Sequence, residues 1–403
     1  MQLNELSIRL RALTVFRSLL SDPVLESICT YLDCLENAWP QGAVSGYAEL
    51  VSRLYRTEEG DLGRHILRIM EESDNVYIRA LGRGETPPDY ISKCVALELE
   101  TLQAAASLQP GQLQEGLDGI DYLPEFGVTP VDLAEAYHER TANVGRYGWG
   151  IYARHHMFYL EGQKIVPVRH PDAIRLGHLA GYQREHEIVL ENTRALLEGR
   201  PAANMLLTGD AGTGKSSTIK AVVNELYPEG LRIIEIRKDQ LRELPAVLDE
   251  LSENPLKFIL FIDDLSFQKG DDNYSALKAV LEGSVSAKSR NVVIYATSNR
   301  RHLVKESFSD REGDDVHRGE TMQEIVSLSE RFGLHVTFQK PAKEAYLSIV
   351  HQLAEEQGIA RPDLDALAEQ FALGRGGRSP RAARQLVDNL TAIGPESKSI
   401  AES

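Results

Sequence analysis

Residues 204–218 read Asn-Met-Leu-Leu-Thr-Gly-Asp-Ala-Gly-Thr-Gly-Lys-Ser-Ser-Thr, an apolar segment followed by a glycine-rich loop and the start of a helix. Gly209, Gly214, Lys215 and Ser216 match the phosphate-binding loop pattern G-x-x-x-x-G-K-S/T. Glycines let such a loop turn tightly and bring backbone N–H groups toward phosphate oxygens. A helix that begins near Lys215 directs its positive end toward the same anion. The stretch therefore predicts the strand–loop–helix unit of a P-loop α/β fold.

This loop predicts a site for a nucleoside triphosphate and its metal ion. The lysine of this motif, here Lys215, is expected to reach the β- and γ-phosphates, and the hydroxyl of Ser216 is expected to be a ligand of Mg²⁺. The residues expected around the phosphates are Gly209, Asp210, Ala211, Gly212, Thr213, Gly214, Lys215, Ser216 and Ser217. The plainer alternative is a glycine-rich turn that binds no ligand.

A second strand carries the acidic partners that this chemistry needs. The apolar run 258–262 ends in Asp263 and Asp264, which is the form of a Walker B element. We expect Asp263 to hold Mg²⁺, through water, because carboxylate oxygens suit this ion. Asp264 is placed to orient or deprotonate the attacking water. The alternative is a buried strand with a solvated acidic end.

Three further side chains are candidates for contact with the γ-phosphate. Asn299 follows the apolar run 292–296, and the alternative to a phosphate contact is a strand-ending asparagine in a turn. Arg331 precedes the last predicted strand, from which it could reach a neighbouring subunit's nucleotide, or pair with a nearby acid. Arg381 begins a late helix, and the neighbouring Arg378 and Arg384 leave that assignment open.

Taken in their order along the chain, these motifs resemble those of an AAA+ ATPase. The resemblance covers residues from about 170 to 392. The resemblance implies a sensor 1 residue at Asn299, an arginine finger at Arg331 and a sensor 2 residue at Arg381. It also implies ATP and Mg²⁺ as ligands, a homo-oligomer, and a parallel five-stranded P-loop sheet flanked by helices. A small helical lid and an all-α N-terminal domain complete the expected fold.

A segment upstream of the loop resembles the adenine-side segment of the same class. Residues 174–183 read Ile-Arg-Leu-Gly-His-Leu-Ala-Gly-Tyr-Gln, and the resemblance places Leu179 and Tyr182 beside the base. The chain also resembles a bacterial AAA+ family catalogued as a domain of unknown function. Residues 261–267, Phe-Ile-Asp-Asp-Leu-Ser-Phe, carry that likeness.

Two features depart from the AAA+ pattern. Most members end the Walker B strand with Asp-Glu, whereas this chain has the shorter Asp264, which could slow hydrolysis. The replication-initiator branch also uses Asp-Asp and hydrolyses ATP, so we expect hydrolysis to be retained. The second departure is a polar insert at residues 308–324, expected to be a mobile surface loop or a loop that contacts a partner.

Periodicity and turn residues divide the 403-residue chain into five segments. Apolar residues at three-to-four spacing predict a helical domain over 1–145. A β-hairpin or linker is expected at 146–168, an α/β nucleotide-binding domain at 169–340 and a helical lid at 341–393. Residues 394–403 are expected to be a disordered tail.

Charge and composition limit the partners that are compatible with this chain. The net charge is −16, and residues 1–160 carry 23 acidic and 13 basic side chains. A general nucleic-acid binder needs clustered cations, so nucleic acid is an unlikely partner. No apolar run approaches the length of a membrane span. The first residues lack the pattern of a signal peptide, and the three cysteines are expected to be unpaired. We therefore expect a cytoplasmic protein that does not associate with a membrane.

Four functions are compatible with these features, and we favour the first. It is an oligomeric ATPase that hydrolyses Mg-ATP to drive conformational change on a macromolecular partner, with the N-terminal helices binding a protein. A DNA-acting initiator or loader is favoured by the Asp-Asp pair and opposed by the acidic N-terminal part. A small-molecule P-loop kinase fits the expected sheet and lid poorly. The fourth is a nucleotide-gated scaffold with little hydrolysis.

Overall fold

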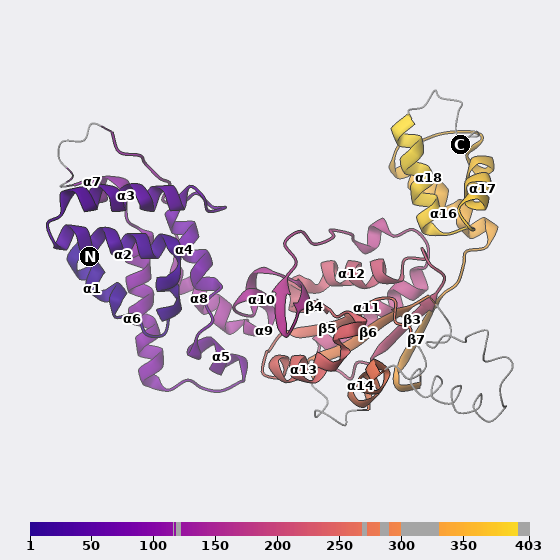
Figure 1. Ribbon diagram of the computed structural model, residues 1–403, viewed down its shortest axis with the longest axis horizontal. Coiled ribbons are helices and arrows are strands. Elements are labelled where there is room, and N and C mark those ends of the chain that lie inside the picture. The colour runs from indigo at the N-terminus through magenta and orange to yellow at the C-terminus, as the bar shows by residue number, and fades with distance from the viewer. Residues whose placement is uncertain (116, 118–121, 268–271, 283–289, 300–329, 394–403) are drawn as a thin grey trace. The chain divides into compact units, whose positions relative to one another are not determined.

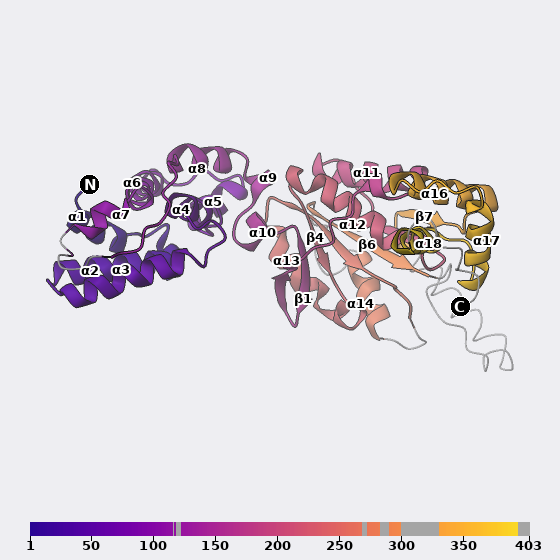
Figure 2. The same ribbon diagram turned by 90° about the horizontal axis from the view of Figure 1, so that it is seen from above.

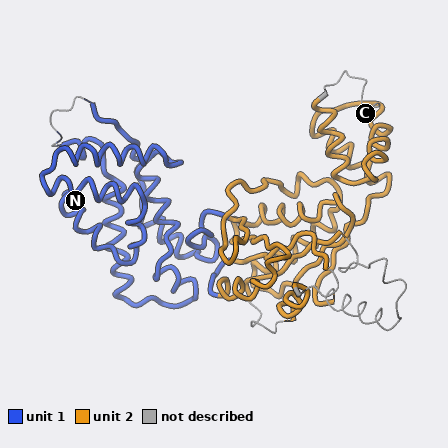
Figure 3. The backbone as a smooth tube through the Cα atoms, in the orientation of Figure 1, with its two compact units in different colours: residues 1–155, 253–256 blue, residues 156–252, 257–403 orange. Residues whose placement is uncertain are grey.

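The computed structural model describes residues 1–403 except 116, 118–121, 268–271, 283–289, 300–329 and 394–403. The predicted insert at 308–324 and the predicted tail lie outside the described residues. The chain divides into two compact units, coloured separately in Figure 3. Unit 1 comprises residues 1–155 and 253–256, and unit 2 comprises residues 156–252 and 257–403.

The described secondary structure of unit 1 is helical apart from one isolated β-bridge between Asp61 and Gly127. Its helices are α1 (Leu3–Arg11), η1 (Arg17–Ser21), α2 (Pro23–Glu36), α3 (Pro40–Leu54), α4 (Leu62–Glu71), α5 (Val76–Gly82), α6 (Asp89–Ala106), α7 (Pro110–Gln114), α8 (Leu133–Ala142), α9 (Val144–Tyr147) and α10 (Ile151–Arg154). The spaced apolar residues of these helices form one buried core. Helix α2 begins at Pro23 because Asp22 accepts the N–H groups of Val24 and Leu25.

A buried carboxylate of helix α6 binds the segment between α1 and η1 in unit 1. Glu98 accepts the backbone N–H groups of Thr14, Val15 and Phe16 at 2.7, 3.1 and 2.8 Å. Charge-assisted bonds of this kind compensate the cost of burying a carboxylate. Glu98 thus has a structural role in the described part of unit 1.

Unit 2 is built on a sheet of seven strands in the order β2-β1-β4-β5-β6-β3-β7. The strands are β1 (Met157–Glu161), β2 (Lys164–Pro167), β3 (Met205–Gly209), β4 (Leu231–Glu235), β5 (Lys257–Ile262), β6 (Val292–Ser298) and β7 (Leu334–Phe338). All pairings are parallel except that of β1 with β2. The strand of the glycine loop, β3, lies between β6 and β7, and β6 separates it from the acidic strand β5.

The predicted count of five strands is wrong, and the hairpin explains the difference. Strand β1 does not stand apart from the sheet but pairs with β4, with Met157 opposite Ile233. The antiparallel strand β2 then forms the outer edge. Alternating burial in β1 fits a strand with one face against the core. The hairpin therefore extends the five-stranded parallel core by two strands.

Helices cover both faces of this sheet, as Figures 1 and 2 show. They are η2 (Leu176–His178), α11 (Gln183–Leu197), α12 (Lys215–Leu226), η3 (Tyr227–Glu229), η4 (Lys238–Glu243), α13 (Leu244–Ser252) and α14 (Asp272–Leu281). Apolar residues of α11 and α12 pack on one face of β3, β4 and β5. Helix α13 lies on the opposite side from α12 in Figure 1.

The C-terminal part of unit 2 is a small helical subdomain with its own core. It consists of α16 (Lys343–Glu356), α17 (Leu364–Gly374) and α18 (Pro380–Ile393). Buried residues such as Tyr346, Val350 and Leu386 hold the three helices together. The expected α/β class is confirmed: a mostly parallel sheet flanked by helices, preceded in sequence by a helical unit and followed by a small helical subdomain. None of the described helices is long and apolar enough to cross a membrane.

Candidate functional site

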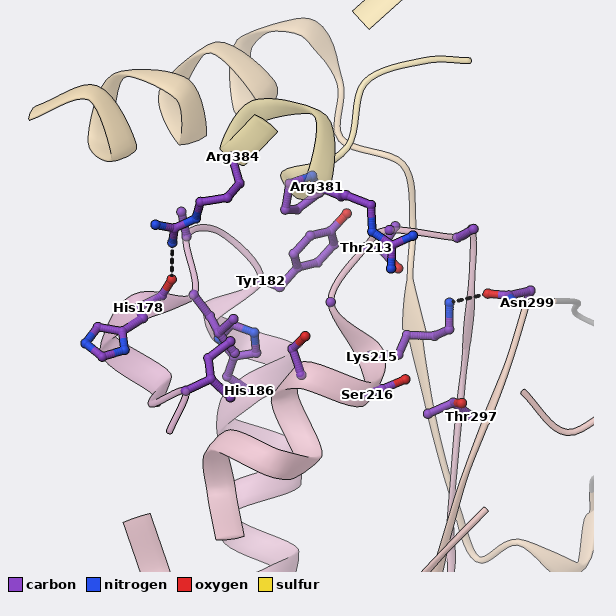
Figure 4. Close-up of a pocket in the computed structure, with 18 of the residues that line it drawn as sticks. His178, Tyr182, His186, Thr213, Lys215, Ser216, Thr297, Asn299, Arg381 and Arg384 are labelled. Atoms are coloured by element: carbon purple, nitrogen blue, oxygen red, sulfur yellow. Dashed lines mark hydrogen bonds between the residues drawn. The ribbon is translucent and has the colours of Figure 1, made fainter. Parts of the chain in front are cut away.

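Most of the predicted site residues line one cavity of about 430 Å³ in unit 2, whereas Gly209, Asp210 and Arg331 do not. This volume is typical of ligand sites. The glycine loop, the ends of β5 and β6, the segment before α11 and the start of α18 form its walls (Figure 4). It is lined by Ile174, His178, Leu179, Ala180, Tyr182, His186, Ala211, Gly212, Thr213, Gly214, Lys215, Ser216, Ser217, Asp263, Asp264, Thr297, Asn299, Leu353, Pro380, Arg381, Arg384 and Gln385.

The loop that follows β3 needs its glycines for steric reasons. Gly209, Gly212 and Gly214 have φ angles of 144°, 80° and 94°, in the region that residues with a Cβ rarely adopt. At Gly209 a Cβ would also overlap the backbone carbonyl of Phe338 on β7. The loop is thus a backbone cradle that side chains would fill.

Lys215 is buried at the base of this cradle, with 6% of its surface exposed. Its Nζ donates to the backbone oxygens of Gly209 and Asp210 at 2.9 and 2.8 Å, and to Asn299 Oδ1 at 2.9 Å. Burial lowers the pKa of Lys215, and the nearby carboxylate of Asp263 opposes that shift. The ammonium group is therefore held where the loop and the strand ends converge.

The acidic pair lies directly beside the loop. Ser216 Oγ donates to Asp263 Oδ1 at 2.6 Å, which brings the two predicted metal ligands together. Thr297 Oγ1 donates to the same carboxylate oxygen and accepts the N–H of Asp264 at 3.0 Å. Asp264 has φ of 50°, so the chain turns sharply where β5 ends.

The amide of Asn299 links the lysine to the second carboxylate. Its Oδ1 accepts the bond from Lys215, and its Nδ2 donates to Asp264 Oδ1 at 2.8 Å. Figure 4 shows the side chains of Asn299 and Lys215 pointing toward each other above Thr297. Together with the bond of Ser216 to Asp263, the structure therefore brings together five of the polar residues that the sequence analysis selected.

Two arginines of α18 line the cavity, whereas Arg378, which precedes this helix, does not. The backbone N–H of Arg381 donates to Gly212 O at 3.2 Å, which places this helix start against the glycine loop. One turn later, Arg384 Nη2 donates to His178 O at 2.8 Å. Arg378 instead forms two bonds with Glu369, at 2.8 and 2.6 Å. Of the three arginines considered for the sensor 2 role, Arg381 and Arg384 thus line the cavity, and the role itself remains a prediction.

The apolar end of the cavity is formed by the segment before α11. Leu179 and Tyr182 both line it, as predicted. Tyr182 has a backbone φ of 59°. Its hydroxyl donates to Gln339 O at 2.5 Å, and the centroid of its ring lies 5.2 Å from that of Phe338. Burial raises the pKa of Tyr182 to about 12, so the phenol stays neutral.

Asn224 of α12 fixes the segment that leads into this end of the cavity. Its Nδ2 donates to Asp172 O and to Ile174 O, each at 2.7 Å, and its Oδ1 lies 3.0 Å from His156 Nε2. A buried amide that joins two carbonyls in this way determines the path of the chain between them.

Arg331 lies outside this cavity. It precedes β7 and contacts Glu282 just beyond the end of α14, with Nε 2.8 Å from Oε1 and a second contact from Nη2. Within one chain the structure therefore does not bring Arg331 to the other predicted site residues. The finger assignment remains a prediction.

Several cavity residues were not selected from the sequence. They include Thr297, His178, His186 and Gln385. A signal existed for Thr297, which lies two positions before Asn299 at the same strand end. His186 lies one helical turn after Tyr182, but a single histidine at that spacing is also typical of a core residue. Burial lowers the pKa of His186 to about 4, so its imidazole is neutral.

The residues beside the loop fit a magnesium ion by their chemistry. Ser216 and Asp263 present hard oxygen donors within hydrogen-bond distance of each other. Mg²⁺ prefers such donors and keeps several waters, so two protein ligands suffice when phosphates supply the others. Among the described residues, no group of three or more histidine, cysteine or acidic side chains is placed to hold a metal by itself.

Comparison with protein families gives one match. The family model described as "Protein of unknown function (DUF815)" matches residues 153–393. A curated relative, the signal recognition particle protein of Rickettsia felis, is 27% identical over 150 residues. That match covers 37% of this chain and 30% of the relative, so the chain spans under a third of the relative's length.

Three solved structures show partial similarity to this chain. A chain of the E. coli MS115-1 HORMA:CdnC:Trip13 complex is 13% identical, with a TM-score of 0.37, covering 54% of this chain and 90% of that one. The Aeropyrum pernix ORC1 protein in complex with DNA is 18% identical, with a TM-score of 0.39 and coverages of 53% and 60%. The Thermotoga maritima RuvB Holliday junction branch migration motor is 17% identical, with a TM-score of 0.36 and coverages of 55% and 66%.

Proposed function

We propose a function for this chain, which belongs to the DUF815 family: it binds ATP with Mg²⁺ and hydrolyses it. One observation carries the proposal. A single cavity collects the lysine and serine of the glycine loop, both strand-end aspartates, Asn299 and two lid arginines. Such a set combines phosphate-binding cations, metal-binding oxygens and a carboxylate near the place where water would attack.

Each polar group then has a distinct task. Lys215 neutralises phosphate charge, and the N–H groups of the loop bind the phosphate oxygens. Asp264 orients and deprotonates the attacking water. Asn299, bonded to Lys215 and to Asp264, keeps the phosphate-binding lysine and this carboxylate in a fixed relation.

The lid arginines complete the charge balance of the proposed site. Arg381 begins α18 beside the glycine loop, where a guanidinium can bind phosphate. Ser216 and Asp263 would hold Mg²⁺. When bound, this ion neutralises developing charge on the phosphate oxygens. The base would lie against Leu179 and Tyr182 at the apolar end of the cavity.

The larger part of the proposal concerns assembly and partners. We propose that the chain forms a homo-oligomer in which Arg331 completes a neighbour's site. Hydrolysis would then move the lid at 341–393 relative to the nucleotide-binding segment at 169–340. The helical segment at 1–145 would bind a protein partner, and its acidic charge disfavours nucleic acid. The hairpin at 146–168 would join these parts.

A second candidate, a nucleotide-gated scaffold with little turnover, is favoured by one observation. Asp264 is shorter than the glutamate common at this position, and its Oδ1 is bonded to Asn299. A carboxylate held in this way has less reach toward a water molecule. Binding would then change the conformation without rapid hydrolysis.

Calorimetry with ATP and Mg²⁺, together with steady-state phosphate release, tests the proposal and separates the two candidates. We expect wild type to bind and hydrolyse ATP, and Lys215→Ala to lose binding. Arg378→Ala is the matched control, because its guanidinium is paired with Glu369 away from the cavity. Binding without turnover would favour the scaffold, and no binding at millimolar ATP would overturn both.

A further inference from the structure

Thr297 contacts both members of the acidic pair. Its hydroxyl donates to Asp263 Oδ1 and accepts the N–H of Asp264 at 3.0 Å. Its backbone oxygen accepts the N–H of Leu265 at 2.7 Å. The side chain is 2% exposed, so these bonds are not exchanged freely with water. This one residue therefore holds three consecutive positions after β5.

The contact continues the sheet beyond its last backbone pair. The pairing of β5 with β6 ends with Ile262 opposite Ala296. At the next position along the two strands, Thr297 lies opposite Asp263. There the hydroxyl of Thr297 replaces a backbone hydrogen bond of the sheet and contacts the carboxylate of Asp263. A residue of β6 thus helps to orient this carboxylate, and Ser216 Oγ donates to the same oxygen at 2.6 Å.

The backbone at Asp264 supports this interpretation. Its φ of 50° is in the left-handed region, which is unfavourable for a residue with a Cβ. Strained residues of this kind persist where surrounding contacts determine them, and they gather at functional sites. Thr297 supplies a bond on the N–H of Asp264, and Asn299 supplies one on its carboxylate.

We propose that Thr297 is a positioning residue that sets the affinity of the site for Mg²⁺ by fixing the carboxylate of Asp263. The inference rests on the proposed function, because it concerns the same metal ligands. Thr297 also holds the turn that places Asp264. Loss of the hydroxyl leaves the carboxylate held only by Ser216 Oγ and the N–H of Asp264. The looser carboxylate weakens metal binding but leaves the phosphate cradle in place.

The test measures binding of a fluorescent ATP analogue to the full chain, first in EDTA and then at increasing MgCl₂. Thr297→Val keeps the shape of the side chain without its hydroxyl, and Thr297→Ser keeps the hydroxyl. Thr193→Val is the matched control, because Thr193 is also a buried threonine whose hydroxyl bonds to Val189 O, at 2.7 Å, remote from the acidic pair. Circular dichroism checks that each variant is folded.

We expect Thr297→Val to need about tenfold more Mg²⁺ for half-maximal enhancement of binding, since a bond to a buried charged group is lost. Its affinity in EDTA should equal that of wild type, and Thr297→Ser should restore the Mg²⁺ requirement. If Thr297→Val fails to fold, Thr297→Ala and Thr297→Ser provide the same comparison.

Two results would overturn the inference. One is an unchanged Mg²⁺ requirement in a folded variant without the hydroxyl, and the other is an equal loss of affinity with and without Mg²⁺. Either result leaves the proposed function standing if wild type binds with Mg²⁺. Failure of wild type to bind at all contradicts the proposed function instead.

Discussion

Arg331 is paired with Glu282 in the isolated chain, with its Nε 2.8 Å from Glu282 Oε1. The two side chains are 25% and 39% exposed, so the pair is partly solvated. Pairs of this kind contribute about 1 kcal/mol or less. If Arg331 serves a neighbouring site, assembly must break this pair, and its small free energy makes the exchange possible.

We therefore expect Glu282→Gln to raise ATP turnover up to about fivefold at protein concentrations where assembly is incomplete, because Arg331 loses its charge-assisted bond to Glu282. Arg331→Ala should abolish most turnover while ATP binding is retained. The measurement is turnover per chain against protein concentration. Unchanged turnover of Arg331→Ala where oligomers form contradicts the finger assignment, and Arg361→Ala is a control for the loss of a surface cation.

Replacement of Asn299 by alanine should slow hydrolysis about 10²-fold, the range seen when one active-site hydrogen bond is removed. ATP affinity should change only a few-fold, because Lys215 keeps its two backbone partners. Asn192→Ala is the matched control, since Asn192 is a half-buried asparagine that bonds to Ala203 O. Single-turnover kinetics with a binding titration measures both quantities, and an equal loss of the two would assign Asn299 to binding alone.

The site could be predicted from the sequence where its residues are close along the chain. The glycine loop and the acidic pair each depend on local order, because a buried strand must run directly into them. The third strand-end residue, Asn299, follows the same rule. Contacts such as that of Arg384 with His178 O join residues far apart in sequence, and no local pattern encodes them.

The number of strands in the sheet also could not be predicted from local sequence patterns alone. Residues 157–167 have the pattern of a hairpin, but the pattern does not say which edge the hairpin joins. Parallel pairing of β1 with β4 depends on tertiary packing. Likewise, sequence shows that Arg331 is near acids but does not select Glu282 from among them.

Gly209→Ala should abolish ATP binding and lower the free energy of unfolding by about 3 kcal/mol or more, because the φ of 144° and the overlap with Phe338 O both disfavour a Cβ. Gly199→Ala separates the two effects, since Gly199 has φ of 71° but no heavy atom near its Cβ position. We expect that control to lose about 1 kcal/mol and to keep ATP binding. Urea unfolding and calorimetry test the pair, and normal binding by Gly209→Ala would contradict the cradle.

The stability of unit 2 should depend on the protonation of His186. Burial lowers its pKa to about 4 from 6.5, so the folded chain keeps a neutral ring while the unfolded chain takes up a proton below pH 6.5. The stability that comes from the neutral ring is present above pH 6.5 and is lost as the pH falls toward 4. Between pH 7 and pH 5 the loss should be about 2 kcal/mol.

His186→Gln removes that proton uptake and should reduce the pH dependence of the unfolding free energy by this amount. Urea titrations at pH 7 and pH 5, followed by circular dichroism, provide the measurement. His138→Gln is the control, because His138 is exposed on α8. A parallel loss of stability in wild type and His186→Gln would assign the acid sensitivity to other groups.

Asn224 offers a way to separate recognition of the base from recognition of the phosphates. Asn224→Asp replaces the amide donors on Asp172 O and Ile174 O with a carboxylate that repels both oxygens. The segment leading to Leu179 and Tyr182 should then shift, while the glycine loop keeps its own bonds. We expect ATP affinity to fall about tenfold, with affinity for inorganic triphosphate unchanged.

Calorimetric titration with ATP and with triphosphate, both in Mg²⁺, measures this difference. Asn143→Asp controls for the added negative charge, because Asn143 is an exposed asparagine that also donates to a backbone oxygen, that of Glu139. An equal loss for both ligands would mean that Asn224 supports the whole cavity, whereas no loss for ATP would place the base away from this segment. A selective loss locates the base at the apolar end of the cavity, because only that end depends on the path that Asn224 fixes.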